Sequence, residues 1–264
     1  MSVAMLNDVT RCIGCRSCQL ACKEWNDLEA TRTRNRGSYE NPPRLSANTY
    51  TRMRFHEFEE RGRLRWVFTK LGCMHCVDPG CVSVCTVGAL QKTAAGPVVY
   101  DATRCIGCRY CEYACPFGVP KYDWDDPLGL IGKCTFCAGR LGAGMAPSCA
   151  KACPVDAIAF GERDELLAEA HRRIRDHRGR YFDHVYGETE AGSTNVLYIG
   201  PCDPAELGLP PLGPEPVTRY SEAVMRAAPL TIVAVAAALS GIAWYTHRRD
   251  DVRASEDAAP EETT

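Results

Sequence analysis

Sixteen of the seventeen cysteines in this chain fall into four closely spaced quartets, and grouped thiols are ligands for metal. The quartets are Cys12, Cys15, Cys18 and Cys22; Cys73, Cys76, Cys81 and Cys85; Cys105, Cys108, Cys111 and Cys115; and Cys134, Cys137, Cys149 and Cys153. The first and third quartets have the spacing C-x2-C-x2-C-x3-C, which is typical of bacterial ferredoxins. Each fourth cysteine lies about one helical turn past the third and points away from its neighbours' cluster, so it binds a different one. The quartets therefore predict [4Fe–4S] clusters, four in number, and one-electron transfer.

A disulfide framework and structural zinc are the alternatives for so many cysteines. Disulfide-rich folds are typical of short secreted chains with a signal peptide, and the residues before Cys12 leave no room for an apolar signal core. Zinc sites usually present two C-x2-C pairs separated by a spacer, and four thiolates packed this closely are unusual for them. Both alternatives are therefore disfavoured.

The strongest internal signal is a repeat. Residues 8–22 read DVTRCIGCRSCQLAC, and residues 101–115 read DATRCIGCRYCEYAC. Gly14 and Gly107 occupy the same position of this repeat. A loop around a cluster needs unusual backbone angles and close approach of peptide N–H groups to sulfur, and both favour a residue without Cβ. We therefore expect two loops of the same conformation.

The rest of the composition excludes several other functions. The formal net charge is -2, so nothing indicates a nucleic-acid partner. No Ser-His-Asp, Cys-His or paired-carboxylate arrangement stands out, so no catalytic residue is assigned. His75, inside Cys-Met-His-Cys, is interpreted as a neighbour of a cluster rather than a ligand, and Cys202 as a buried or idle thiol. The cations beside the ligands, Lys133, Arg11 and Arg104, are candidates for raising cluster potential, the alternative being ordinary surface charge.

The segments between the quartets predict small elements. Apolar runs at 97–100 and 157–160 are interpreted as the short strands of ferredoxin-like modules. The alternating runs 50–58 and 64–69 flank a Glu-Glu-Arg-Gly turn and predict an inserted hairpin.

A helix and a linker are predicted after the last quartet. Residues 162–178 have helical periodicity, with an apolar side made by Leu166, Leu167, Ala170 and Ile174. The basic face at Arg172, Arg173 and Arg175 is expected to be solvated, with a subunit contact as the alternative. Residues 203–216 are rich in Pro and Gly and are interpreted as an extended linker.

Residues 227–245 form a run of nineteen without a charge, which spans roughly 28 Å as a helix and matches a hydrocarbon core of about 30 Å. We expect one transmembrane anchor helix, with a buried core helix as the alternative. Arg248, Arg249 and Arg253 follow the run, against Arg219 and Arg226 before it, which favours a cytoplasmic C-terminus and an exported cluster domain. The acidic tail beyond Asp250 is expected to be disordered.

Several segments resemble the iron–sulfur (beta) subunit of membrane-bound formate dehydrogenases, within the molybdopterin oxidoreductase family. They are CIGCRSCQLACKEWND (12–27), GSYENPPRLSANTYTRMRFHE (37–57), LGCMHCVDPGC (71–81), CIGCRYCEYACPFGVPKY (105–122) and KCTFC (133–137). The likeness covers most of residues 5–250. The quartets alone fit nitrate, dimethyl sulfoxide, polysulfide and hydrogenase relatives equally well, and the segments 24–27 and 37–57 favour formate.

The resemblance implies how the ligands pair. One cluster takes Cys12, Cys15, Cys18 and Cys153; the second Cys134, Cys137, Cys149 and Cys22; the third Cys73, Cys76, Cys81 and Cys115; the fourth Cys105, Cys108, Cys111 and Cys85. The implied fold class is α+β: two fused bacterial-ferredoxin-like dicluster modules with inserted loops and a hairpin, plus one C-terminal transmembrane helix. The expected divisions are 1–70 and 127–163 for the first module, 71–126 for the second, 164–222 for the helix and linker, 223–247 for the anchor and 248–264 for the acidic tail.

The same resemblance implies the partners. They are a large catalytic subunit that binds a molybdenum or tungsten pterin, and a membrane cytochrome b subunit that reduces quinone. The family's beta subunit is usually exported folded, on the twin-arginine signal of the large subunit. That export route would explain a membrane protein without a signal of its own.

Overall fold

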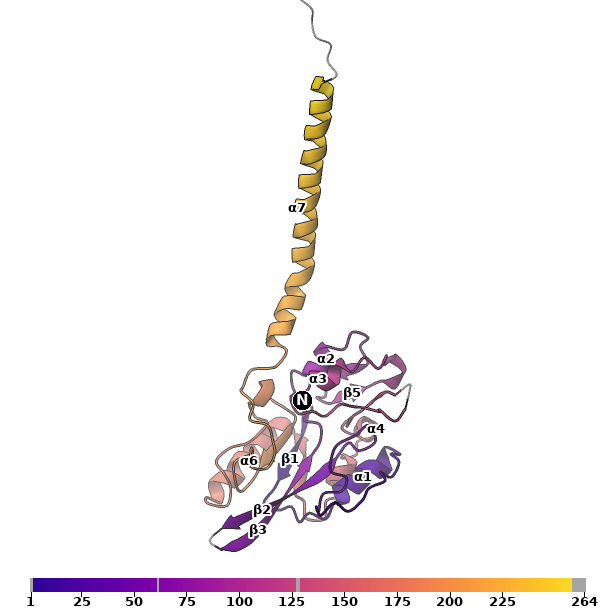
Figure 1. Cartoon of the computed structure of the whole chain (residues 1–264). Coiled ribbons are helices and arrows are strands. Elements are labelled where there is room, and N and C mark those ends of the chain that lie inside the picture. The colour runs from indigo at the N-terminus through magenta and orange to yellow at the C-terminus, as the bar shows by residue number, and fades with distance from the viewer. Residues whose placement is uncertain (1, 61, 127–128, 258–264) are drawn as a thin grey trace, which may run out of the picture. The chain divides into compact units, whose positions relative to one another are not determined.

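A computed structural model of the chain describes residues 2–60, 62–126 and 129–257 (Figure 1). The residues up to Thr218 form one compact unit, and those from Arg219 form a second. The first unit contains all seventeen cysteines. It is the cluster domain.

The cluster domain contains a three-stranded sheet. Its central strand β1 (Val3–Asp8) pairs antiparallel with β8 (Ile158–Glu162) and parallel with β9 (Val196–Ile199). Successive side chains of a strand point to opposite faces. Leu6 therefore packs under the helix α6 (Arg163–Asp176), whereas Met5 joins the core around the cysteines.

The remaining strands form three small antiparallel pairs, and short helices lie between them. The hairpin pairs β2 (Arg52–Glu60) with β3 (Arg63–Leu71); the other pairs are β4 (Leu90–Lys92) with β5 (Val98–Tyr100), and β6 (Lys121–Tyr122) with β7 (Ile131–Gly132). The short helices are α1 (Ser17–Trp25), α2 (Gly80–Ser83), α3 (Tyr110–Tyr113), α4 (Ala138–Gly142) and α5 (Ser148–Lys151), with single 3-10 turns at Ala102–Arg104 and Glu190–Gly192.

These elements confirm the α+β fold expected from the sequence. The predicted hairpin is β2–β3, the predicted strands at 97–100 and 157–160 are β5 and β8, and the predicted helix at 162–178 is α6. The parallel pairing of β1 with β9 was not predicted, because it joins residues about 190 positions apart that share no local pattern.

Two expectations about the C-terminal part of the cluster domain need correction. Arg173 is not simply solvated, because it donates to the buried Asp8 at 3.0 Å and to Glu169 at 2.6 Å. The segment 203–216 has no helix or strand, as expected of a linker, but it packs onto the domain: Leu207 and Leu209 are buried in the core around the cysteines. Leucine side chains keep this Pro-rich stretch on the apolar core.

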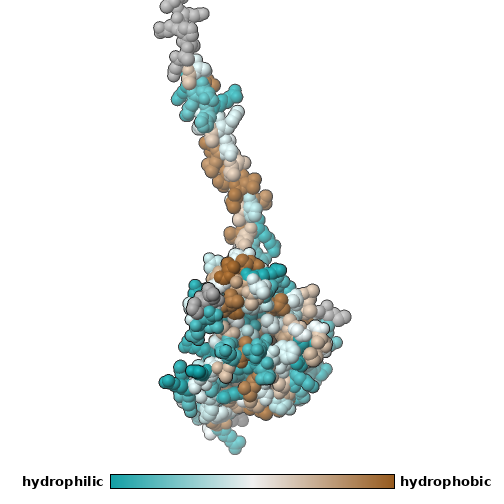
Figure 2. All heavy atoms as spheres, turned by 90° about the vertical axis from the view of Figure 1, so that its right-hand side faces the viewer, coloured by the Kyte–Doolittle hydropathy of each residue, from teal (hydrophilic) through white to brown (hydrophobic). Residues whose placement is uncertain are grey.

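The second unit consists of the helix α7 (Arg219–Asp257) in its described part. Its stretch from Ser221 to Ser255 is long and apolar enough to span a membrane. Figure 2 shows an apolar band along the helix and hydrophilic residues toward its C-terminal end. The helix runs past Asp250, where disorder was expected; the Ala, Asp and Arg residues there are compatible with helix, and propagation from a formed helix is easy. The rest of the expected acidic tail, 258–264, lies outside the described residues.

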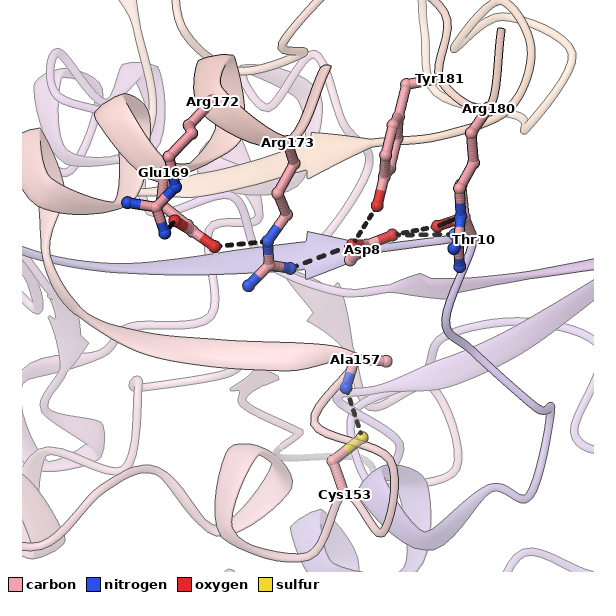
Figure 3. Close-up of polar contacts among 9 residues, drawn as sticks. All are labelled: Asp8, Thr10, Cys153, Ala157, Glu169, Arg172, Arg173, Arg180 and Tyr181. Carbon is pink, nitrogen blue, oxygen red and sulfur yellow. Dashed lines mark hydrogen bonds and ion pairs between the residues drawn. The ribbon is translucent and has the colours of Figure 1, made fainter. Parts of the chain in front are cut away.

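The buried carboxylate of Asp8 ties β1 to the C-terminal part of the domain (Figure 3). It accepts hydrogen bonds from the Thr10 amide at 3.1 Å, the Thr10 hydroxyl at 2.7 Å and the Tyr181 hydroxyl at 2.9 Å, and pairs with Arg173 at 3.0 Å. Thr10 stands two residues before the first cysteine, Cys12. The network therefore fixes the entrance to the first quartet.

We expect the substitution Asp8→Asn to destabilise the cluster domain by about 2–3 kcal/mol, because it leaves the Arg173 guanidinium without its buried partner. Anaerobic thermal unfolding of the holoprotein should show a midpoint lower by about 4–12 °C.

The matched control is Asp101→Asn, at the same position of the sequence repeat. Asp101 makes the same local bonds to Thr103, at 3.0 and 2.6 Å, but 44% of its side chain is exposed and its ion pair is with the nearby Arg104. Its replacement should shift the midpoint far less. Equal shifts for the two variants would show that the local turn, not the long-range network, supplies the stability.

Candidate metal centres

The two repeated loops have the same backbone conformation, as the sequence predicts. Gly14 and Gly107 both have φ of 67°, and the following Arg16 and Arg109 have φ of 63° and 65°. A Cβ atom on Gly14 would lie 2.9 Å from the ring of Phe68. Each loop ends at a left-handed arginine that begins α1 or α3, and this turn directs the cysteines of the loop to one point.

Backbone N–H groups point at several of the sulfur atoms. The amide of Gly107 donates to Cys105 Sγ at 3.5 Å, that of Phe136 to Cys134 Sγ at 3.3 Å and that of Ala157 to Cys153 Sγ at 3.2 Å. The last of these is drawn in Figure 3. Such donors stabilise negative charge on sulfur and are one of the factors that set cluster potential.

Three cavities of the cluster domain are lined by cysteines. The first contains Cys12, Cys15, Cys18 and Cys153; the second contains Cys22, Cys134, Cys137 and Cys149, together with Cys73; and the third contains Cys85, Cys105, Cys108 and Cys111. We call the four cysteines of the first cavity the first group, and those of the third cavity the fourth group. The second group is Cys22, Cys134, Cys137 and Cys149, without Cys73. Each group joins cysteines from two different quartets.

Four cysteines of the quartets remain, Cys73, Cys76, Cys81 and Cys115, and we call them the third group. Burial raises the pKa of Cys76, and the neighbouring thiols of Cys73, Cys115 and Cys81 raise it further. Cys73 therefore lies at the boundary of two groups, because it also lines the cavity of the second.

The thiols are costly to ionise unless a cation compensates their charge. Burial raises the pKa of Cys18 to about 12 and that of Cys22 to about 11. A buried thiol becomes a thiolate when it binds metal, and the binding releases its proton. The four sets of converging thiols thus fit groups that carry iron.

The spacing of the cysteines in the quartets fits clusters better than single ions. A zinc ion needs its sulfur ligands within about 2.3 Å of one point. A [4Fe–4S] cluster binds its cysteines at separate corners of a larger body.

His75 is a buried neighbour of the cysteines, as the sequence predicts. The Val98 amide donates to its Nδ1 at 3.0 Å, so Nε2 carries the proton of the neutral ring and faces Cys134 Sγ at 3.4 Å. Burial, followed by the charge of Lys133, holds the pKa of His75 well below its usual value. The ring therefore serves as a neutral donor to sulfur.

The three cations singled out in the sequence lie in different surroundings. Lys133 is buried and donates to the carbonyl oxygens of Val98 and Cys134, each at 2.6 Å. Arg11 and Arg104 are exposed, so solvent and salt screen their charges. Of the three, Lys133 has the surroundings in which a charge acts strongly on the cysteines.

Two further features lie away from the cysteine groups. Cys202 belongs to none of them, and burial raises the pKa of its thiol to about 11. A cavity of about 520 Å³ is lined by the hairpin, the β6 region and the segment around Gly208, and no cysteine lines it. Its cations Arg52 and Arg54 pair with Glu40 at 2.6 and 3.6 Å.

Sequence reasoning missed Lys70, which lines both the first and the second cavity. It lies on β3 opposite Met53, and only 8% of it is exposed. The one signal in the sequence is its place three residues before Cys73. A lysine in an alternating strand is ordinarily expected on the solvent side.

Comparisons with known proteins support the binding of [4Fe–4S] clusters. Two family models, each described as a 4Fe-4S dicluster domain, match residues 11–89 and 64–163. The chain is 44% identical to the iron-sulfur subunit of the nitrate-inducible formate dehydrogenase of Escherichia coli (strain K12), over 200 residues that cover 75% of this chain and 67% of that protein. It therefore spans about two thirds of that relative's length.

Two other relatives extend the comparison. The hydrogenase-2 operon protein HybA of Escherichia coli O157:H7 is 37% identical over 245 residues, covering 80% of this chain and 74% of that protein. A protein of Nitratidesulfovibrio vulgaris is 38% identical over 261 residues, covering 97% of this chain and 70% of its own length. The dicluster matches and the converging thiols together show that this chain carries [4Fe–4S] clusters.

Proposed function

This chain belongs to the family of formate dehydrogenase iron–sulfur subunits, and on that premise we propose that it is the electron-transfer subunit of a membrane-bound formate dehydrogenase. It holds four [4Fe–4S] clusters, one at each cysteine group. Its partners are a large catalytic subunit with a molybdenum or tungsten pterin and a membrane cytochrome b subunit that passes electrons to quinone. The observation that carries the proposal is the serial order of the four groups.

Neighbouring thiols give that order. Burial raises the pKa of Cys18 to about 12, and Cys149 of the second group also raises it, so the first group adjoins the second. Burial and then the thiols of Cys22 and Cys73 raise the pKa of Cys134, so the second group adjoins the third.

The last junction follows from the third group. Burial raises the pKa of Cys81 to about 12, and Cys111 of the fourth group contributes to the increase. The four groups thus form one series. A series suits an electron relay, because an electron can pass stepwise from each centre to an adjacent one.

The two ends of the series are the groups that reach the surface. Of the seventeen cysteines, only Cys15 and Cys108 are exposed, and they belong to the first and fourth groups. Beside them, Ile13 and Ile106 expose 55% and 65% of their surface. Apolar residues around a redox centre at the surface favour docking of a partner protein there.

The clusters supply reversible one-electron transfer when they are bound. The chain's own residues hold the thiolates, direct peptide N–H groups to sulfur and exclude water from the inner groups. The cysteines of the second group, for example, are buried or half-buried. No residue of this chain is assigned to the oxidation of formate.

A hydrogenase complex is the second candidate, because the likeness to the hydrogenase-2 operon protein covers 80% of this chain. The cysteine groups serve either complex equally well. The two differ in the substrate of the catalytic subunit, so an experiment on the assembled complex separates them.

The proposed function is tested by purifying the native complex through a tag on this chain and measuring formate-dependent quinone reduction. We expect Cys15→Ser and Cys108→Ser each to lower this rate at least tenfold, because each removes a ligand at one end of the series. Formate oxidation by a soluble dye that takes electrons at the catalytic subunit should persist.

Cys202→Ser is the matched control, and it should keep the full quinone rate. A complex that oxidises hydrogen but not formate would support the hydrogenase alternative. A full quinone rate in Cys108→Ser would contradict the relay.

We also propose the cross-ligation of the quartets, supported by the cavity in which Cys22 lies beside Cys134, Cys137 and Cys149. Replacing Cys22 by Ser should damage the cluster of the second group and largely spare the one held by Cys12 and its neighbours. Iron content and paramagnetic resonance of the anaerobic complex measure this. Loss of the first group's signal with retention of the second would refute the pairing.

The membrane side is proposed from charge. Next to the apolar run, Arg248, Arg249 and Arg253 follow it and Arg219 and Arg226 precede it, so on this proposal the C-terminus is cytoplasmic and the cluster domain exported. Green fluorescent protein fused to the C-terminus should fluoresce, and alkaline phosphatase fused there should be inactive. An active phosphatase fusion would reverse the orientation.

A further inference from the structure

Lys70 occupies a buried position between two cysteine groups. It lies on β3, in register with the buried Met53 on β2, and 8% of it is exposed. The Tyr198 hydroxyl donates to the Lys70 carbonyl oxygen at 2.8 Å, which ties this end of β3 to β9. The backbone of Lys70 is therefore fixed from two sides.

Lys70 is also the one described residue that lines both of the first two cysteine cavities. One cavity holds Cys18 with Cys12, Cys15 and Cys153, and the other holds Cys149 with Cys22, Cys134 and Cys137. An electron that passes between the first and second groups passes beside this side chain.

The ammonium of Lys70 has no protein counter-ion. Among the residues that the structure describes, no hydrogen bond or ion pair involves its Nζ atom. An unpaired buried ammonium is strongly unfavourable, so its charge needs a negative partner nearby. Lys70 lines one cavity together with Cys18 of the first group and the other together with Cys149 of the second. The nearest negative groups are thus cysteine sulfurs on both sides.

We propose that Lys70 is a positioning cation shared by the clusters of the first and second groups, which raises the reduction potential of both. The proposal rests on the proposed four-cluster relay. A [4Fe–4S] cluster with four thiolates carries net negative charge, and reduction adds one more electron. A fixed ammonium on the low-dielectric side of both clusters stabilises each reduced state, and it offsets the repulsion between two reduced neighbours.

The arginines beside the first group do not line the second cavity. Arg11 and Arg16 also stand beside ligands of the first group, but Arg11 is exposed and the guanidinium of Arg16 lies over the Phe55 ring at 4.9 Å. Water and salt screen exposed charges, whereas a buried charge acts nearly unscreened. Lys70 is therefore the buried cation that the first and second centres share, whereas the buried Lys133 lies beside the second and third.

The test is an anaerobic redox titration of the purified complex, followed by paramagnetic resonance. In Lys70→Met, the equilibrium constant for reducing the first and second clusters should fall about tenfold, which is about 59 mV for a one-electron couple. The third and fourth clusters should keep their potentials. Lys70→Arg keeps the charge and should stay close to the unaltered protein.

Lys23→Met is the matched control, because Lys23 follows the ligand Cys22 directly but is less buried and bonds to the carbonyl oxygens of Glu29 and Asn48. It should leave all potentials in place. Lys70→Gln is a second uncharged variant, should Lys70→Met fail to assemble, and iron content per chain reports assembly.

Unchanged potentials in a fully loaded Lys70→Met or Lys70→Gln complex would overturn the proposal. An equal fall at all four clusters would also overturn it, because that result indicates a general structural effect. Neither outcome depends on the substrate of the catalytic subunit, so failure of this inference is distinct from failure of the formate assignment. An iron content well below that of four clusters per chain in the unaltered protein would instead contradict the proposed function.

Discussion

The structure depends on one constraint: the thiols that bind iron must carry negative charge inside a small protein. Burial opposes that charge, as the raised pKa of Cys18 and of Cys22 indicates. Iron supplies most of the compensation, but the chain must bring the thiols together and add hydrogen-bond donors. Loops with left-handed residues meet both needs, because they direct several side chains and several peptide N–H groups toward one point.

The sheet determines which thiols meet. β1 precedes the first quartet and β8 follows the last, and their antiparallel pairing brings Cys153 to the cavity that holds Cys12. The Asp8 network then joins the same strand to α6 and Tyr181 (Figure 3). The hairpin β2–β3 contributes a wall with Phe68 and Lys70. The loops can be short because the long-range contacts are made by this scaffold.

The sequence predicts the local features well and the long-range ones poorly. Spacing and the repeat predict the quartets and the loop conformation at Gly14, because both depend on neighbouring residues. The parallel partner of β1 and the place of Arg173 were missed, since each depends on contacts more than 160 positions apart. Lys70 was missed for a related reason: periodicity cannot distinguish a strand facing water from one facing buried sulfur.

The position of the buried cations adds an asymmetry to a repeated architecture. The loops at Gly14 and Gly107 are alike, and each places one exposed cysteine at an end of the proposed series. The interior junctions differ. Lys70 lies between the first and second groups, and Lys133 acts on Cys134 of the second and Cys81 of the third. A repeated binding loop thus supplies the centres, whereas unrepeated buried lysines make the electrostatic surroundings of successive centres unequal.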